Sequence, residues 1–229
     1  MIKIKKLIQS VVTWYGPCYS KRLGIELEKK NEIFKWFLAS ILFGAPINEK
    51  SAIKTYFCFK KYKVLSPEKI IETGWNGLVK ILDEGSYTRY DFKTADKLLE
   101  VMKNLVKNYD SDINKIRESA SNTEDLKNKI KALGKGIGDI TINIFLRELR
   151  YVWKIRDLEL SKFTIISGKN LGIIKEGSFD EIEEVWKKNR LPGYDAIDLE
   201  TSLLKIGKDL CRKGKCNLCK VIDFCRWRK

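Results

Sequence analysis

The sequence predicts an all-α protein, and three observations lead to this prediction. Helix-capping residues recur along the chain, segments with the alternating pattern of strands are few, and Gly and Pro fall between the helical segments. The 229 residues are 44% apolar, enough for one large domain or two small lobes with a core. We therefore expect about ten helices and no long flexible linker.

The individual helices are predicted from their caps and their apolar periodicity. A nearly all-apolar segment, 32–46, is expected to be a helix buried on most sides. Asn48 and Ser66 cap the next helices, and Ser178 with Glu181 forms a capping box for a later one. The other expected helices are 74–83, 91–109, a short one after 111, 123–133, 139–153 and 195–210, whereas 1–31 shows only weak helix signals.

The charge of the chain indicates a polyanionic partner. There are 45 Lys and Arg against 30 Asp and Glu, a net charge of +15. Because neutralised phosphates supply most non-specific affinity for nucleic acid, this excess favours nucleic acid over a basic protein with no such partner. The basic residues are spread along the chain and no apolar run reaches the ~20 residues that span a bilayer, so no membrane partner is expected. The N-terminus lacks the features of a signal peptide, and we expect an intracellular protein.

Histidine is absent from the sequence. This absence excludes a histidine general base, a Ser-His-Asp triad and any histidine metal ligand. Acid–base chemistry must therefore come from Asp, Glu, Lys, Tyr or Cys.

Two glycines around one apolar residue, Gly136-Ile137-Gly138, join a charged periodic helix to an apolar one. Glycine tolerates positive φ and carries no Cβ, so other groups can approach its backbone closely. The N–H groups of such a turn, beside a helix N-terminus, suit a phosphate oxygen. An ordinary helix–helix connector is the alternative, since short turns with Gly are common there.

Four of the six cysteines lie within the last 19 residues, with the spacing C-x4-C-x2-C-x5-C. Four thiolates so close together, without histidine, suit an iron–sulfur or a zinc site. Disulfides are disfavoured in a chain without a secretory signal. One x2 pair between two single cysteines favours a [4Fe–4S] cluster, with zinc as the alternative. The predicted ligands are Cys211, Cys216, Cys219 and Cys225, whereas Cys18 and Cys58 are expected to be core thiols.

Basic residues surround these four cysteines, among them Lys213 and Lys215. A basic loop held in place by a cluster would be a rigid phosphate-binding surface. The alternative is a solvated, charged tail.

The chain carries a helix–Gly-Ile-Gly–helix hairpin and, some 70 residues later, the four-cysteine loop. In this order of motifs it resembles the endonuclease III branch of the helix–hairpin–helix DNA glycosylases. The family hairpin reads roughly Leu-Pro-Gly-Val-Gly-x-x-Thr-Ala, and residues 135–142 match it from the proline position onward. The family cysteine loop reads C-x6-C-x2-C-x5-C, so the last two spacings match and the first is two residues shorter here. The resemblance covers about residues 30–225, because the order of helices also fits.

This resemblance implies a two-lobed, all-α helix–hairpin–helix glycosylase fold with a C-terminal [4Fe–4S] loop. One domain would be the central bundle, 29–152, and the other would join 1–28 to 153–229. The chain would be a monomeric base-excision repair enzyme in the cytoplasm, associated with the nucleoid. Double-stranded DNA would be held by the hairpin and the cysteine loop while the target base is flipped out. The implied DNA-binding residues are Lys135, Gly136, Ile137, Gly138, Thr141, Asn48, Lys213 and Lys215.

Two positions then define the implied chemistry. Family members that also cut the backbone carry a lysine just before the hairpin threonine, where this chain has Ile140, so it resembles the monofunctional members. The family aspartate lies about 18 residues further on, at the start of the next helix, and Asp157 lies 17 beyond Ile140. Asp157 is the predicted catalytic carboxylate, with Glu159 in reserve and a plain N-cap role as the alternative.

Three functional hypotheses follow from these residues. The first is a monofunctional glycosylase, the second is a non-catalytic DNA-binding protein of the same fold, and the third is a glycosylase with lyase activity through another lysine. The excised base is not specified by these motifs. Uracil or mismatched thymine, alkylated purines and oxidised bases all stay open.

Overall fold

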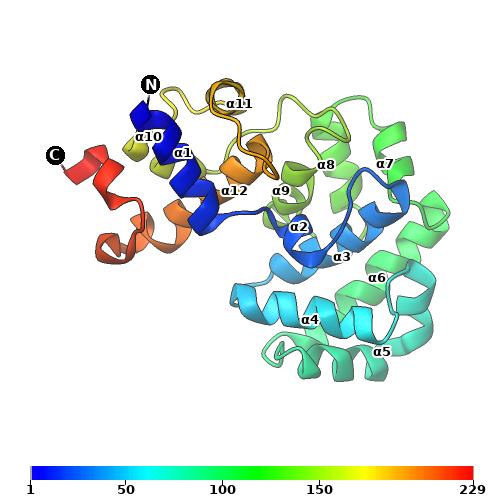
Figure 1. Ribbon diagram of the computed structural model, residues 1–229. Helices are drawn as coiled ribbons and strands as arrows, with labels where there is room; N and C mark the ends of the chain where they lie inside the picture. The colour runs from blue at the N-terminus through cyan, green and yellow to red at the C-terminus, as the bar shows by residue number, and fades with distance from the viewer. Residues whose placement is uncertain (1, 229) are drawn as a thin grey trace. The chain divides into compact units, whose positions relative to one another are not determined.

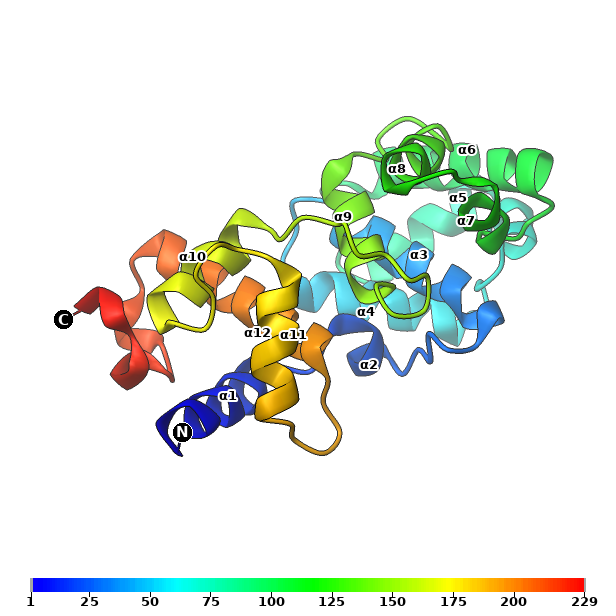
Figure 2. The ribbon, with the colours of Figure 1, turned by 90° about the horizontal axis from the view of Figure 1, so that it is seen from above.

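The computed structural model describes residues 2–228, and within them it contains helices and turns but no strand (Figures 1 and 2). The predicted all-α class is therefore confirmed. None of the described helices is long and apolar enough to cross a membrane. The helices are α1 (Ile2–Tyr15), α2 (Tyr19–Leu23), α3 (Ile33–Phe43), α4 (Glu49–Lys61), α5 (Pro67–Glu84), α6 (Asp91–Tyr109), α7 (Asn114–Ser119), α8 (Thr123–Lys131), α9 (Asp139–Glu148), α10 (Lys162–Leu171), α11 (Phe179–Lys188) and α12 (Ala196–Asp209).

The chain forms two compact units. One is the continuous segment Leu23–Ile155, and the other joins the chain up to Arg22 with the chain from Arg156 onward. The domain division expected from the sequence, 29–152 against 1–28 with 153–229, stays a prediction.

The unit Leu23–Ile155 is built around α3, which is buried along most of its length. Trp36 donates a hydrogen bond from its indole Nε1 to the Phe145 carbonyl of α9 at 3.0 Å, and the rings of Phe37 and Phe145 lie 5.1 Å apart. At the end of α3, a Cβ on Gly44 would lie only 2.1 Å from Oγ1 of Thr141. This close packing fixes α9, and therefore the second helix of the hairpin, on the core.

The other unit is built around α12, which packs against α10, α1 and α11. Its apolar core includes Leu7, Ile8, Val11 and Val12 of α1, all nearly inaccessible to solvent. Helix α1 therefore contradicts the expectation of only weak helix before residue 31. Its apolar residues are spaced so that they form one face of a helix.

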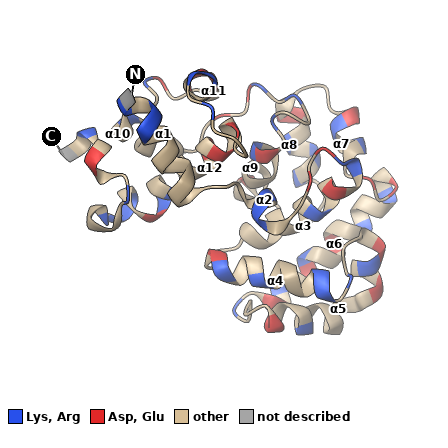
Figure 3. Cartoon of the chain, in the orientation of Figure 1, with Lys and Arg blue, Asp and Glu red and all other residues tan. Residues whose placement is uncertain are grey.

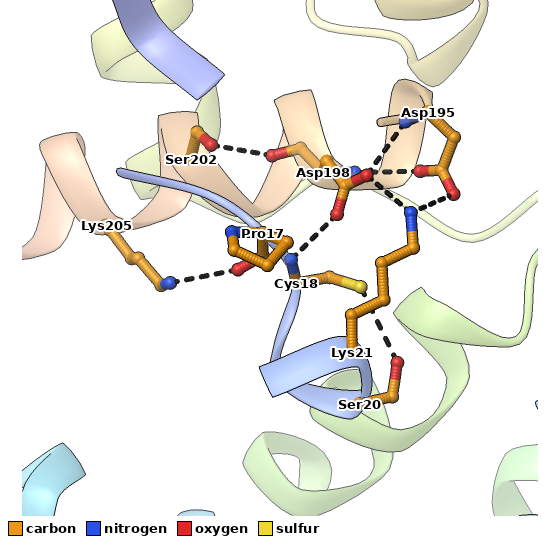
Figure 4. A network of polar contacts seen from close by, with 8 residues as sticks. All are labelled: Pro17, Cys18, Ser20, Lys21, Asp195, Asp198, Ser202 and Lys205. Atoms are coloured by element: carbon orange, nitrogen blue, oxygen red, sulfur yellow. Dashed lines mark hydrogen bonds and ion pairs between the residues drawn. The ribbon is translucent and has the colours of Figure 1, made fainter. Parts of the chain in front are cut away.

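A network of polar contacts ties the segment after α1 to the start of α12 (Figure 4). The backbone N–H of Cys18 donates to Oδ1 of the fully buried Asp198 at 2.8 Å. The ammonium of Lys21 lies 2.6 Å from Asp198 and 2.9 Å from Asp195. Burial alone would lower the pKa of Lys21, but the two carboxylates raise it above its usual range. Nζ of Lys205 donates to the Pro17 carbonyl at 3.3 Å.

The predicted capping box at the start of α11 is confirmed and extends further back. The Glu181 carboxylate accepts hydrogen bonds from four successive backbone N–H groups, those of residues 175–178, at 2.6 to 3.2 Å. Its partial burial opposes ionisation, but these donors outweigh that effect and lower the pKa of Glu181 to about 2.

Replacing this carboxylate by an amide, Glu181→Gln, is expected to lower the free energy of unfolding by about 1 kcal/mol, because several N–H groups lose a charged acceptor. The stabilisation is fully present above the ordinary glutamate pKa of 4.5 and is lost as the pH falls towards 2. Urea denaturation at pH 7 and at acid pH measures it. Glu184→Gln, on the exposed side of the same helix, is the control. Equal free energies of unfolding for the two variants at pH 7 would contradict a stabilising role of the Glu181 carboxylate.

Candidate nucleic-acid interface

The predicted hairpin is present: α8 and α9 are joined by a turn whose apolar residues point inward. Leu133 and Ile137 are 1% and 2% exposed and anchor the turn, whereas Lys135 and Gly136 are exposed. Gly136 has a φ of 87°, in the left-handed region that favours glycine. Gly138 is the N-cap of α9 and provides no side-chain acceptor for the first N–H groups of that helix. The turn therefore presents the backbone at Gly136 and the side chain of Lys135 to solvent.

The residue at the position of the family lysine lies in the first turn of α9. Ile140 is 68% exposed, which is unusual for an isoleucine. The next residue, Thr141, is only 3% exposed and packs against Gly44, as described above. Its side chain therefore serves the packing of α3 on α9, and its predicted contact with DNA stays a prediction.

The loop between α3 and α4 contains Asn48, one of the predicted DNA-binding residues. The Oδ1 atom of Asn48 accepts the N–H of Ser51 at 2.8 Å, and its Nδ2 donates to the Ser51 hydroxyl at 3.0 Å. Asn48 is thus the N-cap of α4, as expected from the sequence. Because the same side chain holds the helix start, its insertion into DNA would require breaking the cap.

The structure corrects the expectation that Asp157 begins a helix. The next helix, α10, begins at Lys162, and its N-cap is Ser161, whose hydroxyl accepts the N–H of Phe163 at 3.3 Å. Asp157 and Glu159 are exposed and lie in the non-helical segment before that cap. Buried Leu158 and Leu160 alternate with exposed neighbours in this non-helical segment, so the helix start that the family resemblance implied at Asp157 lies five residues further on, at Lys162.

The C-terminal cysteines lie in a loop of short 3₁₀ turns after α12, η2 (Cys211–Lys213), η3 (Cys216–Leu218), η4 (Ile222–Phe224) and η5 (Arg226–Arg228). None of the four is in a disulfide. Cys211, Cys219 and Cys225 are half-buried against the core of their unit. Burial raises the pKa of the Cys211 thiol, and the other three cysteines are close enough to raise it further.

One polar group from α1 approaches these thiols. The Tyr15 hydroxyl lies 3.8 Å from Sγ of Cys219 and accepts the N–H of Lys220 at 2.9 Å. Burial raises the pKa of Tyr15 to about 12, so it is a neutral hydrogen-bond donor at pH 7.

Zinc and iron–sulfur clusters place different demands on the spacing of their thiolate ligands. A single zinc ion holds its sulfurs at about 2.3 Å, and within residues 2–228 no three Cys, Asp or Glu side chains are arranged to hold a single ion. An iron–sulfur cluster binds each thiolate at a different iron and accepts a wider spacing. The four half-buried thiols, which form no disulfide, provide a donor set whose chemistry suits an iron–sulfur cluster, with zinc as the alternative.

The surface of the cysteine loop is basic. Lys213 lies 3.3 Å from Asp209, which offsets part of its charge, and Lys215 is exposed. The Lys220 ammonium lies 5.5 Å from the ring centroid of the exposed Trp14. Figure 3 shows that Lys and Arg are also distributed over the helices of both units. A cation of the loop therefore lies beside an exposed aromatic ring of α1, a combination that nucleic-acid-binding surfaces often use.

Comparison with known proteins supports the fold. No family model and no curated protein sequence matches the chain. The chain is similar to a solved structure of a trapped endonuclease III–DNA covalent intermediate, an estranged-adenine complex, with 17% identity and a TM-score of 0.52. The match covers 97% of this chain and 95% of that chain. The chain therefore has the endonuclease III fold, the helix–hairpin–helix glycosylase fold expected from its hairpin.

Proposed function

We propose that this chain is a DNA glycosylase that binds duplex DNA and hydrolyses the N-glycosidic bond of a flipped base with water. The observation that carries this proposal is the hairpin, with exposed backbone at Gly136, in a chain of the endonuclease III fold. The similar protein was itself trapped as a covalent intermediate with DNA. The charge of +15 supports a polyanionic partner.

In this proposal each predicted residue has a physical role. The backbone N–H groups of Gly136 and Gly138 bind a phosphate oxygen, whereas the N–H of Ile137 donates to the Gly134 carbonyl within the turn. The cations Lys213 and Lys215 bind a second stretch of DNA backbone. The Asp157 carboxylate stabilises the positive charge that develops on the sugar and orients the attacking water, with Glu159 as the alternative carboxylate.

The four C-terminal cysteines would hold a [4Fe–4S] cluster. Bound there, the cluster would fix the shape of a loop that has no regular secondary structure beyond short turns. The Tyr15 hydroxyl donates to the Cys219 thiol at 3.8 Å, a contact that holds the loop against α1 and would orient this thiolate toward a cluster.

The reaction proposed here uses no covalent intermediate with the enzyme. The hydrocarbon side chain of Ile140 cannot form a Schiff base with the sugar. Because Ile140 is 68% exposed, a lysine fits at this position without loss of packing. Ile140→Lys is therefore expected to create borohydride-trappable complexes with abasic DNA, while wild type forms none. Trapping by wild type would indicate that another lysine forms the Schiff base. Ile140→Met, which replaces the isoleucine by a long side chain without an amine, is the control and is expected to give no trapped complex.

A non-catalytic DNA-binding protein is the second candidate, and one observation favours it. The start of α10 carries a hydroxyl, Ser161, where the family resemblance implies a carboxylate. The two candidates are separated by incubating the protein with duplexes that each carry one lesion. A glycosylase releases a base from at least one duplex, whereas the second candidate binds them all and releases none.

A further inference from the structure

One face of α6 supports the hairpin. The Asn104 side chain donates from Nδ2 to the Leu133 carbonyl at 2.8 Å, at the start of the turn. One helical turn earlier, Oε1 of Glu100 accepts the N–H of Lys135 at 3.1 Å. The hairpin of the resembled family has proline where this chain has Lys135, and proline has no N–H. Glu100 therefore accepts a hydrogen bond from an N–H group that is present only because residue 135 is a lysine. These two contacts hold the hairpin backbone against α6.

Lys97 continues this face and lies against the hairpin glycine. A Cβ on Gly136 would lie 2.7 Å from Cε of Lys97 and 3.4 Å from its Nζ. The spacing of Lys97, Glu100 and Asn104 is three and four residues, so all three share one side of α6. The Lys97 ammonium is therefore at the turn that exposes its backbone to solvent.

The Lys97 ammonium forms no ion pair with a carboxylate within residues 2–228. The carboxylate one helical turn away on the same face, that of Glu100, accepts the N–H of Lys135 instead. Lys97 is also half-buried, and this burial lowers its pKa. A partly desolvated and unpaired cation is unfavourable unless an anion binds it.

We infer that Lys97 is a ligand of the DNA phosphate that binds at the hairpin, so that one phosphate is held by backbone N–H groups on one side and by this ammonium on the other. The inference rests on the proposed binding of duplex DNA and adds a residue from a helix outside the hairpin motif. The phosphate replaces the water that burial removes from the ammonium, and it supplies the missing counter-ion.

The test is the salt dependence of binding to an undamaged duplex. Each phosphate contact contributes about one unit to the slope of log K against log salt concentration. Lys97→Met, which keeps the apolar stem, is expected to reduce the slope by about one unit and to weaken binding several-fold at low salt. Lys97→Arg is expected to keep the slope of wild type. Lys103→Met, at an exposed position on another face of α6, is the matched control.

A second measurement uses the unaltered protein. Acetylation of lysines is followed by mass spectrometry with and without the duplex, and Lys97 is expected to be protected while Lys103 is modified equally in both. Equal slopes for Lys97→Met and Lys103→Met, or no protection of Lys97 while wild type binds DNA, would overturn the inference. Failure of wild type to bind the duplex at all would instead overturn the proposed function.

Discussion

Asp157→Asn is expected to lower the rate of base release by about 100-fold or more, because a positioned carboxylate contributes that much to proton transfer and charge stabilisation in hydrolysis. Affinity for the duplex should stay within about twofold of wild type, since the exposed side chain is not among the cations that bind phosphate. Single-turnover release from the preferred lesion measures the first quantity, and binding to the same duplex measures the second.

Two further variants make this test specific. Glu159→Gln is expected to retain most activity, and Ser161→Ala is expected to cost about 1 kcal/mol of stability through loss of the α10 cap without loss of chemistry. If Glu159→Gln loses activity and Asp157→Asn does not, the reserve carboxylate is the catalytic one. Undiminished release by the Asp157/Glu159 double variant would contradict a role for either carboxylate.

If the four cysteines hold the proposed cluster, Cys219→Ser is expected to destabilise the protein by several kcal/mol and to remove the iron, because binding at a metal site contributes directly to folding. Cys219 is half-buried against the core and lies beside the Tyr15 hydroxyl, so a lost ligand also loosens the contact of the loop with α1. Iron and sulfide analysis, the visible absorbance of the cluster and the melting temperature measure these effects.

Cys58→Ala is the matched control for the loss of a thiol. Cys58 is buried in the unit Leu23–Ile155, apart in sequence from the cysteine loop, so iron content should be unchanged. Stoichiometric zinc in the wild type would favour the alternative metal. Wild-type protein prepared without oxygen that contains neither iron nor zinc would contradict a metal site at these cysteines.

Helix starts could be predicted from the sequence because a capping side chain binds backbone N–H groups only two or three residues away. Asn48 caps α4, and the Ser178 box begins α11, as their side chains and spacing indicated. Helix ends were less predictable where packing decides them. The helix expected to reach 46 stops at Phe43, where Gly44 packs against Thr141, and the helix expected to reach 153 stops at Glu148.

The contacts between distant segments had no signal in the sequence. In the sequence Lys97 is one of several lysines of an amphipathic helix and has no feature that marks it as different from a surface lysine. In the folded chain its side chain lies against Gly136 of the hairpin. The pairing of Lys21 with Asp198 joins residues 177 positions apart. Motifs therefore identified the hairpin and the cysteine loop, whereas the residues that support them required the three-dimensional structure.

The most direct test of the central claim is base release by wild-type protein from a panel of duplexes, each with one lesion, scored with and without alkali. The panel contains uracil and thymine opposite guanine, alkylated purines and oxidised bases. We expect release from at least one duplex, with strand cleavage only after alkali, as hydrolysis by water without a lysine intermediate requires. Salt-dependent binding to every duplex with release from none would contradict the glycosylase assignment.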